Sequence, residues 1–169
     1  MPILSLAAVA RAPVQLRQEL PAHVFQWDAS GLDLRSPVRI DLEAGMVGEG
    51  VLVRGQIEAD FAGECRRCLA EVRVRVRDTV DLLFEPLRGE EELELSGEVY
   101  PLPERGDRLD LVPPLRDELM LRIPDFVVCS ESCRGLCPQC GAEWNRTTCE
   151  CVLEAEASPW DALKDIEFD

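Results

Sequence analysis

Alternation of apolar and polar residues dominates the first half of the chain. The alternating segments, rich in β-branched residues, are Val14–Leu20, Val38–Leu42, Gly50–Phe61 and Glu71–Phe84. Successive side chains of a strand point to opposite faces of a sheet, so this pattern predicts strands with one buried face. Glycines between the segments favour short turns and therefore antiparallel pairing. We expect a mainly antiparallel β sheet or a partial barrel, with a bulge at Gly55.

The clearest alternation, of valine with arginine, runs over residues 72–77. A period of two directs the valines into the core and places Arg73, Arg75 and Arg77 along the outer face of the sheet. Three guanidinium groups about 6.5–7 Å apart match a run of phosphates or carboxylates. The same row also fits an ordinary solvated face whose charge is balanced by acidic residues on neighbouring strands. Both interpretations stay open at this point.

The periodicity changes after residue 107. Asp110 and the two prolines at 113–114 indicate a helix start, and Pro124 ends the run. Between them, apolar residues recur at helical spacing at Leu111, Leu115, Leu119 and Ile123. This stripe predicts a helix near 110–123 that packs on the sheet.

These elements together predict an α+β protein with a β-rich body over residues 1–125 and a smaller C-terminal part over 126–169. Residues 86–107 carry glycine, proline and a run of glutamates, so we expect an exposed connection there. A serine followed by proline predicts a short terminal helix over Ser158–Phe168. No apolar stretch approaches the ~20 residues of a membrane-spanning helix, and the first residues lack a basic region ahead of an apolar one. We therefore expect a cytoplasmic protein that does not enter the membrane.

Eight cysteines form the most specific motif of the chain. They are Cys65, Cys68, Cys129, Cys133, Cys137, Cys140, Cys149 and Cys151. Six of them fall within 23 positions, and the first two form a separate C-x2-C pair. In a reducing compartment such clusters bind metal more often than they form disulfides, and Zn²⁺ takes four thiolates in a tetrahedron. The sequence therefore predicts two structural zinc ions and a C-terminal zinc ribbon or knuckle.

The spacing divides the eight cysteines into two sets of four. The C-P-Q-C-G segment that starts at Cys137 is typical of a zinc-knuckle turn, because Gly141 tolerates the positive φ that such a turn often needs. The nearest cysteines complete this set, named site 2, which contains Cys137, Cys140, Cys149 and Cys151. The other set, named site 1, would tie the ribbon to the body and contains Cys65, Cys68, Cys129 and Cys133. Two alternatives stay open: the pair Cys65 and Cys68 is merely buried or redox-active, or the cysteines form disulfides in an oxidising compartment.

The residue pattern contains no recognisable catalytic motif. All-thiolate zinc sites are closed and structural, whereas catalytic zinc keeps an open position and generally uses histidine or carboxylate ligands. The one histidine, His23, is distant in sequence from every cysteine, and we expect it at the surface or the edge of the core. The sequence has no Gly-rich phosphate loop and no nucleophile elbow. We therefore predict a non-enzymatic protein without a small-molecule substrate, and a zinc-dependent hydrolase is the alternative that metal-dependent turnover would indicate.

Net charge restricts the partners of the chain. Eighteen basic and 33 acidic residues give a formal net charge of −15, which repels the phosphate backbone of nucleic acids. Five basic residues nevertheless fall within twelve positions, and they are Arg66, Arg67, Arg73, Arg75 and Arg77. The sequence thus combines an acidic body with a local basic strip.

Four segments occur in a specific order along the second half of the chain. They are Cys65-Arg66-Arg67-Cys68-Leu69, the helix end Glu118–Pro124, the segment 133–151 with C-R-G-L-C-P-Q-C-G, Asn145 and C-E-C, and S-P-W-D-A-L from Ser158. In combination they resemble the bacterial YceD family, and the resemblance covers about residues 35–169. It implies a role in accumulation of the large-subunit ribosomal RNA and in ribosome biogenesis. Trp144 and Trp160 depart from the family pattern, which commonly has leucine and arginine there.

Two kinds of partner fit the role that the resemblance implies. The first is a precursor particle of the large-subunit ribosomal RNA, contacted by the arginine strip and Arg134, with Trp144 available to stack on bases. The second is a basic ribosomal protein or assembly factor, held by a zinc-stabilised acidic module without direct RNA contact. The net charge slightly favours the second partner.

Overall fold

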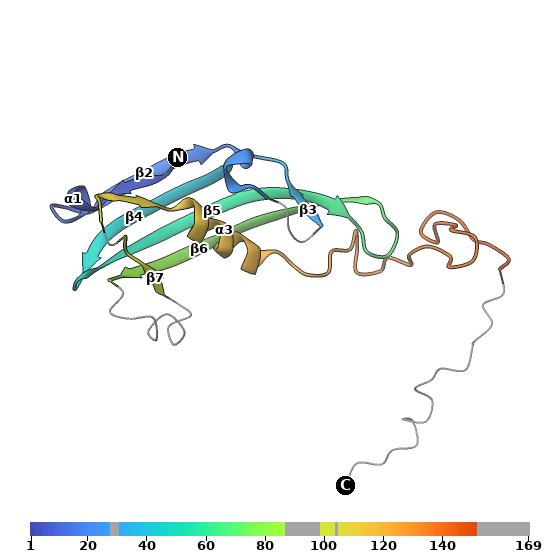
Figure 1. The fold of residues 1–169 in the computed structure, drawn as a ribbon. Coiled ribbons are helices and arrows are strands. Elements are labelled where there is room, and N and C mark those ends of the chain that lie inside the picture. The colour runs from blue at the N-terminus through green and yellow to red at the C-terminus, as the bar shows by residue number, and fades with distance from the viewer. Residues whose placement is uncertain (28–30, 87–98, 104, 152–169) are drawn as a thin grey trace, which may run out of the picture.

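The computed structural model describes residues 1–27, 31–86, 99–103 and 105–151. Within these ranges the largest unit is a six-stranded sheet in the order β2-β4-β5-β6-β7, with β3 paired to β5 (Figure 1). Its strands are β2 (Val14–Leu20), β3 (Leu32–Leu34), β4 (Val38–Val47), β5 (Gly50–Glu64), β6 (Glu71–Glu85) and β7 (Val99–Pro101). The terminal helix expected over Ser158–Phe168 and most of the expected connection lie outside the described residues.

Antiparallel pairing confirms the sheet type that the alternation predicts. Strand β2 has the expected bounds and pairs with β4 along all seven of its residues. The β5–β6 hairpin runs in unbroken antiparallel register over fourteen residue pairs, from Val51–Phe84 to Glu64–Glu71. Strand β7 is the exception among these pairings, because it joins the end of β6 in parallel. Local alternation does not reveal the direction of a neighbouring strand, so the sequence could not predict this pair.

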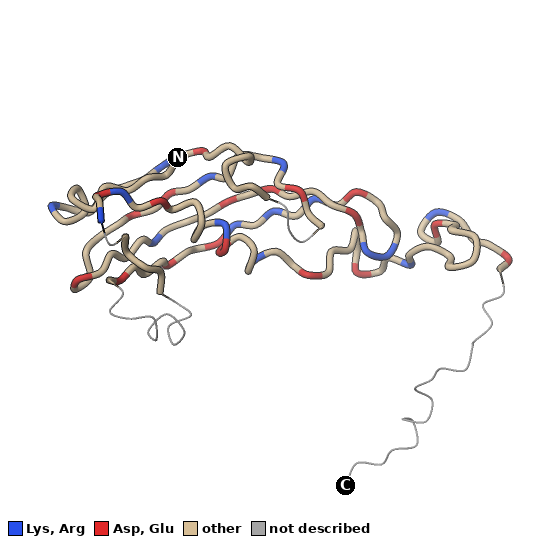
Figure 2. The backbone as a smooth tube through the Cα atoms, viewed as in Figure 1, with Lys and Arg blue, Asp and Glu red and all other residues tan. Residues whose placement is uncertain are grey.

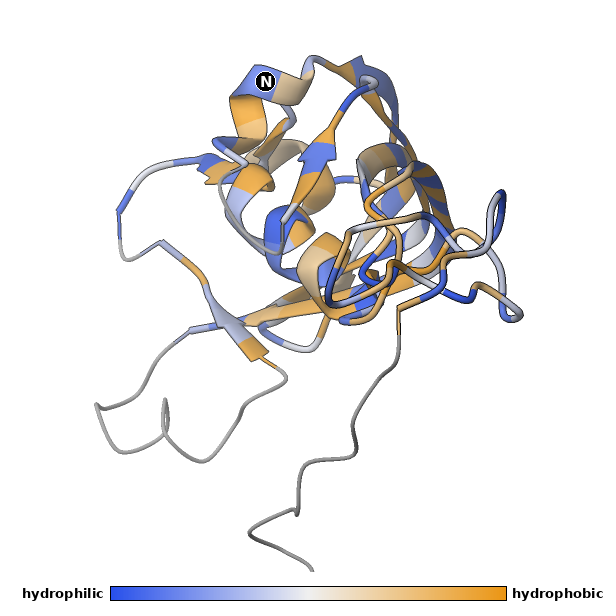
Figure 3. Ribbon diagram, turned by 90° about the vertical axis from the view of Figure 1, so that its right-hand side faces the viewer, coloured by the Kyte–Doolittle hydropathy of each residue, from blue (hydrophilic) through white to orange (hydrophobic). Residues whose placement is uncertain are grey.

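The core lies on one face of the sheet and includes helix α3 (Val112–Arg122). Leu115 and Leu119 of this helix are fully buried, and they pack in the same core as Leu82 and Phe84 of β6. The helix begins where the Asp110 carboxylate accepts a hydrogen bond from the Val112 N–H (2.9 Å). Figure 3 views the molecule from the cysteine-rich end and shows apolar and polar residues alternating along the chain. The packed helix predicted from the apolar stripe is therefore confirmed.

Several short elements near the N-terminus were not predicted from the pattern. They are β1 (Ile3–Ser5), which pairs with β8 (Arg108–Asp110), the helix α1 (Leu6–Val9) and the 3₁₀ helix η1 (Ala22–Phe25). Each has three or four residues, which is too short for a period to be recognised. His23 lies exposed on η1. Of the helices that are described, none is long and apolar enough to cross a membrane.

The Asp107 carboxylate links the first residues of the chain to the segment before α3. It accepts hydrogen bonds from the Ser5 hydroxyl (2.6 Å) and from the Ala7 N–H. Ser5 also caps α1, because its hydroxyl oxygen accepts a bond from the Ala8 N–H (3.2 Å). Contacts between residues about 100 positions apart therefore hold these short elements in place.

The bulge expected at Gly55 is wrong. Residues on both sides of Gly55 pair in continuous register with β4 and with β6. The structural reason for the glycine is the close approach of β4, because a Cβ at this position would lie 2.1 Å from the Asp41 carbonyl oxygen. The φ of Gly55 is +151°, which L side chains rarely adopt. Gly55 thus allows close strand contact without an inserted residue.

Candidate metal centres

The cysteines gather at the end of the sheet where a turn joins β5 to β6, and the segment after α3 continues beyond this turn (Figure 1). The structure brings the eight sulfurs together in two groups of four. Site 1 contains Cys65, Cys68, Cys129 and Cys133, and site 2 contains Cys137, Cys140, Cys149 and Cys151. Within each group, the Sγ atoms all lie within 4.8 Å of one another. The groups have the same members as the two sets separated by sequence spacing.

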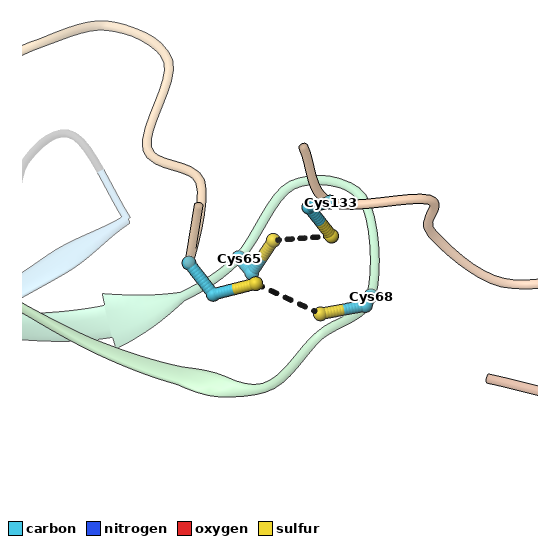
Figure 4. A group of neighbouring side chains, drawn as sticks. Cys65, Cys68 and Cys133 are labelled. Atoms are coloured by element: carbon cyan, nitrogen blue, oxygen red, sulfur yellow. Dashed lines mark hydrogen bonds between the residues drawn. The ribbon is translucent and has the colours of Figure 1, made fainter. Parts of the chain in front are cut away.

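The sulfur-to-sulfur distances of site 1 suit a tetrahedral metal ion. The Sγ atoms of Cys65 and Cys133 are 3.8 Å apart, and those of Cys68 and Cys129 are 3.6 Å apart. Four sulfurs at about 2.3 Å from one ion lie about 3.8 Å from each other, whereas the two sulfurs of a disulfide are only about 2.05 Å apart. Figure 4 shows the sulfurs of Cys65, Cys68 and Cys133 directed toward one another. Each group of four could therefore hold one metal ion.

Both sites are built on the same backbone turn. In site 1 the Cys65 N–H donates to the carbonyl five residues later (2.8 Å), and the Leu69 N–H donates to the Cys65 carbonyl (2.9 Å). In site 2 the Cys137 N–H and the Gly141 N–H make the corresponding two bonds, both 2.9 Å long. Leu69 and Gly141 both have a positive φ, as the wrapping of the turn requires. The C-x2-C spacing thus specifies one local geometry at two distant places in the chain.

Site 1 joins the sheet to the segment after α3. Cys65, Cys68 and Cys133 are buried, and they form a small apolar cluster separate from the main core. The Arg66 N–H donates to the Val127 carbonyl (2.9 Å), which holds the two chain segments side by side. Site 2 is more open, because three of its four cysteines are exposed or half-buried. The geometry of site 1 therefore depends on the sheet, whereas site 2 is formed within residues 137–151.

Cysteine sulfurs of both sites accept hydrogen bonds from groups outside the two cysteine sets. The bonds run from the Arg67 N–H to Cys65 Sγ (3.4 Å), from Asn145 Nδ2 to Cys133 Sγ (3.3 Å) and from Trp144 Nε1 to Cys149 Sγ (3.4 Å). Such donors orient metal ligands and stabilise thiolates. Sequence reasoning marked Asn145 only as part of a motif and gave it no contact. Its proximity to Cys133 depends on the fold of the loop, which spacing does not reveal.

Each site contains one thiol with a strongly lowered pKa and one with a strongly raised pKa. Burial opposes ionisation of Cys65, but nearby backbone N–H groups lower its pKa to about 6. The Ala70 N–H favours the ionised form of Cys68, yet burial and the neighbouring thiols raise its pKa to about 12. In site 2, backbone N–H groups lower the pKa of Cys137 to about 6, and neighbouring thiols raise that of Cys151 to about 12. Four adjacent thiols ionise together only when a cation balances their charge, which is what a divalent metal supplies.

The arginine row of β6 lies on the exposed outer face of the sheet. Arg75 forms ion pairs with Asp60 (2.7 Å) and Glu58 (3.8 Å) on the adjacent strand β5. The hydrogen bond from Arg75 lowers the pKa of Asp60 below its ordinary value. Arg77 lies opposite Glu58 in the strand register, and Arg73 is 3.8 Å from a glutamate two residues earlier in the same strand. Acidic residues therefore accompany each member of the row.

Charge balance extends across the rest of this face. Arg39 of β4 pairs with Glu19 of β2 (3.1 Å) and with Glu58 of β5 (3.4 Å), which makes a ladder of alternating charges. Arg17 and Asp41 form a further pair at 2.9 Å. Figure 2 shows basic and acidic residues interspersed along the strands. This arrangement favours the interpretation of the arginine row as a solvated, balanced face.

The other residues expected to contact RNA or a partner lie around the cysteine sites. The Arg66 guanidinium lies 5.8 Å from the centre of the Phe126 ring, in a cation–π contact. The Arg67 guanidinium donates to two backbone carbonyls of the segment 131–133, at 3.1 and 3.0 Å. The Arg134 side chain is exposed, and Trp144 is half-buried beside site 2. Arg67 and Trp144 therefore have structural contacts within the cysteine-rich segment.

An open groove of about 1330 Å³ lies beside site 1. Its lining includes Cys65, Leu69 and residues of the β3, β5 and β6 strands. Four arginines and four acidic residues line it, so the groove has no net charge from its side chains. Arg35 pairs there with Asp33 at 2.8 Å. The groove is a surface of mixed charge and not a basic channel.

Fold and site together define an open, mostly antiparallel sheet protein with two four-cysteine groups that could bind metal ions. The chain belongs to the YceD family. The model of that family, described as "Large ribosomal RNA subunit accumulation protein YceD", matches residues 53–167. The resemblance stated from the sequence motifs is therefore confirmed.

Similar proteins occur in bacteria and in a plant. A Mycobacterium bovis protein named as uncharacterized is 39% identical over 111 residues, which cover 65% of this chain and 53% of that protein. A Mycobacterium leprae protein, also named as uncharacterized, is 29% identical over 140 residues, or 80% of this chain and 59% of its own. Arabidopsis thaliana "Large ribosomal RNA subunit accumulation protein YCED homolog 1, chloroplastic" is 28% identical over 64 residues, or 38% of this chain and 20% of its own. The chain spans about half the length of the curated relatives it matches, and no solved structure matches it.

Proposed function

We propose that this chain is a non-enzymatic zinc-binding factor in the accumulation of the large-subunit ribosomal RNA. Membership of the YceD family supports the role in ribosome biogenesis. The convergence of four cysteine sulfurs at each of two sites is the observation that carries the metal assignment. The distances of 3.6 and 3.8 Å between sulfurs at site 1 suit the edges of a zinc tetrahedron.

Zinc suits these sites because it takes four soft thiolate ligands in a closed tetrahedron. A closed site leaves no position for a reactive water, so the ions contribute to folding and not to catalysis. Site 1 takes two ligands from the β5–β6 turn and two from the segment after α3, and it would thereby join a body over residues 1–125 to a metal-binding module over 126–169. Thiolate ligands remain reduced in the cytoplasm, where we place the protein.

For the direct partner we propose a basic ribosomal protein or assembly factor. The formal net charge of −15 attracts basic proteins and repels phosphate backbones. The arginines of the sheet are accompanied by acids, and the groove beside site 1 has balanced charge. Direct contact with RNA in precursor particles is the second candidate, supported by the exposed side chains of Arg73 and Arg134.

A substitution at site 1 tests the role in RNA accumulation. Cells that carry the double variant Cys65→Ser/Cys68→Ser in place of the natural chain should contain less large-subunit RNA relative to small-subunit RNA. Elemental analysis of the purified variant should show about one zinc per chain instead of two. His23→Ala, an exposed change outside both sites, is the matched control. An unchanged RNA ratio in cells whose variant has lost zinc would contradict the proposal.

A second experiment separates the two partners. The triple variant Arg73→Ser/Arg75→Ser/Arg77→Ser removes the arginine row but leaves the cysteine sites intact. If a protein is the direct partner, the variant should still sediment with precursor particles of the large subunit. Loss of co-sedimentation, with zinc content and folding unchanged, would instead support RNA contact through the row.

A further inference from the structure

Two adjacent residues bond to sulfurs of different sites. Trp144 Nε1 donates to Cys149 Sγ of site 2 (3.4 Å). Asn145 Nδ2 donates to Cys133 Sγ of site 1 (3.3 Å). Both residues belong to the loop between Cys140 and Cys149, which site 2 closes. The loop of one site therefore supplies a hydrogen bond to a ligand atom of the other.

The Asn145 amide has a second contact that holds it against site 1. Its Oδ1 accepts a hydrogen bond from the Arg134 N–H (2.8 Å), the residue directly after Cys133. The two bonds use both ends of the amide, so its orientation is determined. Asn145 thus holds the backbone and the sulfur of the Cys133 region at the same time.

Backbone hydrogen bonds complete a continuous connection between the sites. The Trp144 N–H donates to the Gly135 carbonyl (3.0 Å), and the Leu136 N–H donates to the Arg67 carbonyl (3.1 Å). The Arg67 N–H in turn donates to Cys65 Sγ (3.4 Å). At Gly135, a Cβ would lie 2.9 Å from the Arg67 carbonyl oxygen, so this series of hydrogen bonds requires glycine at position 135. Residues 133–137 are therefore held between the site 1 turn and the site 2 loop.

We propose that metal binding at the two sites is positively coupled, with Asn145 as the positioning residue that connects them. This inference rests on the proposed metal binding of both cysteine groups. Closing site 2 around an ion orders the loop that carries Asn145, and the amide is then already in place when site 1 fills. By linkage, filling site 1 favours site 2 by the same factor.

Native mass spectrometry of the full chain tests the coupling without any substitution. The reduced protein is equilibrated with Zn²⁺ at the buffered free concentration that fills half of all sites, and the molecules with none, one and two ions are counted. Independent sites, equal or unequal in affinity, leave at least about half of the molecules with one ion, whereas positive coupling that outweighs any difference in affinity between the sites leaves fewer. We expect coupling of that strength and therefore a one-ion fraction below about half, and a larger one-ion fraction would overturn the inference.

The variant Asn145→Ala tests the assigned residue. It should raise the one-ion fraction to about half or more, and it should weaken zinc binding at site 1 by about ten- to a hundredfold in competition with a chelating dye. Arg146→Ala, which removes only the exposed ion pair with Glu143, is the matched control and should behave as the parent. If Asn145→Ala does not fold, Trp144→Phe keeps an aromatic side chain and removes the donor to Cys149, and it should also raise the one-ion fraction.

The outcomes separate this inference from the proposed function. Two ions per chain with a one-ion fraction of at least about half would overturn the coupling and leave the zinc assignment intact. A folded Asn145→Ala variant with the distribution of the parent would overturn the role of Asn145. A chain that takes up no zinc at all would overturn the metal assignment itself, and the coupling with it.

Discussion

Leu69 and Gly141 occupy the same position in the two C-x2-C turns, one residue after the second cysteine, with φ of +61° and +72°. Glycine adopts this conformation without cost, whereas a residue with a Cβ is strained there by about 1–2 kcal/mol. Leu69 is 58% exposed, so its burial offsets little of that strain. Site 1 is therefore built on a strained turn and site 2 on a relaxed one.

Replacing Leu69 by glycine should stabilise the protein. Relief of the strain exceeds the added flexibility of the unfolded chain, and we expect the free energy of unfolding to rise by up to about 1 kcal/mol. The matched variant is Gly141→Ala, where a Cβ would meet no atom within 4 Å, so only the backbone conformation opposes it. This variant should lose about 1 kcal/mol. Urea unfolding of the zinc-loaded proteins measures both changes, and a loss of stability in Leu69→Gly would refute the strain.

Removal of metal should loosen the cysteine-rich segment more than the sheet. Metal binding supplies about 10–16 kcal/mol in small zinc-stabilised peptides, and residues 129–151 have few buried apolar side chains of their own. The strands β4, β5 and β6 keep a large core that does not involve the cysteines. After chelation, amide hydrogen exchange should become fast over 129–151 and remain slow over 51–61. If residues 129–151 kept the same protection after chelation as before it, this expectation would be contradicted.

Gly55→Ala should be strongly destabilising. A Cβ would lie 2.1 Å from the Asp41 carbonyl oxygen and 2.8 Å from the Leu42 Cα, so the β4–β5 pair must separate locally. We expect a loss of more than about 2 kcal/mol in the free energy of unfolding, measured with urea. Gly45→Ala on β4 is the control, because a Cβ there meets nothing within 4 Å. A loss at Gly55 no larger than that at Gly45 would show that the close strand approach carries no cost.

The N-terminal elements should loosen in acid. Hydrogen bonds from the Ser5 hydroxyl and the Ala7 N–H lower the pKa of Asp107 below its ordinary value of 3.8. A carboxyl with a lower pKa in the folded chain contributes stability above the unfolded pKa, and this contribution is lost as the pH falls through the folded pKa. Amide protection of α1 should therefore decrease as the pH falls below about 4.

Two variants check the origin of that acid effect. Asp107→Asn removes the charge, so α1 should be less protected at neutral pH and should show little further change in acid. Asp125→Asn, a second exposed carboxylate, should retain the behaviour of the parent. Protection of α1 that responds to pH equally in Asp107→Asn and in the parent would assign the effect to another group.

The strands and the helix were predictable because their signals are local. Val14–Leu20 has the expected bounds, and β6 ends one residue beyond the expected range. Strand β4 extends five residues beyond the expected Leu42, because pairing with β5 continues through a segment with weak alternation. The short pair β1–β8 was not predictable, since its two strands are about 100 residues apart and neither has a period of its own.

The sequence by itself determined the alternation that makes an antiparallel sheet, the apolar stripe of α3, and the repeated C-x2-C spacing that wraps two similar turns. These features follow from covalent geometry and side-chain periodicity within a few residues. Only the tertiary structure decided that acids of neighbouring strands balance the arginine row, that β4 approaches Gly55, and that Asn145 reaches Cys133. Each of these depends on distances between separate segments, which packing of the whole chain establishes and local sequence does not contain.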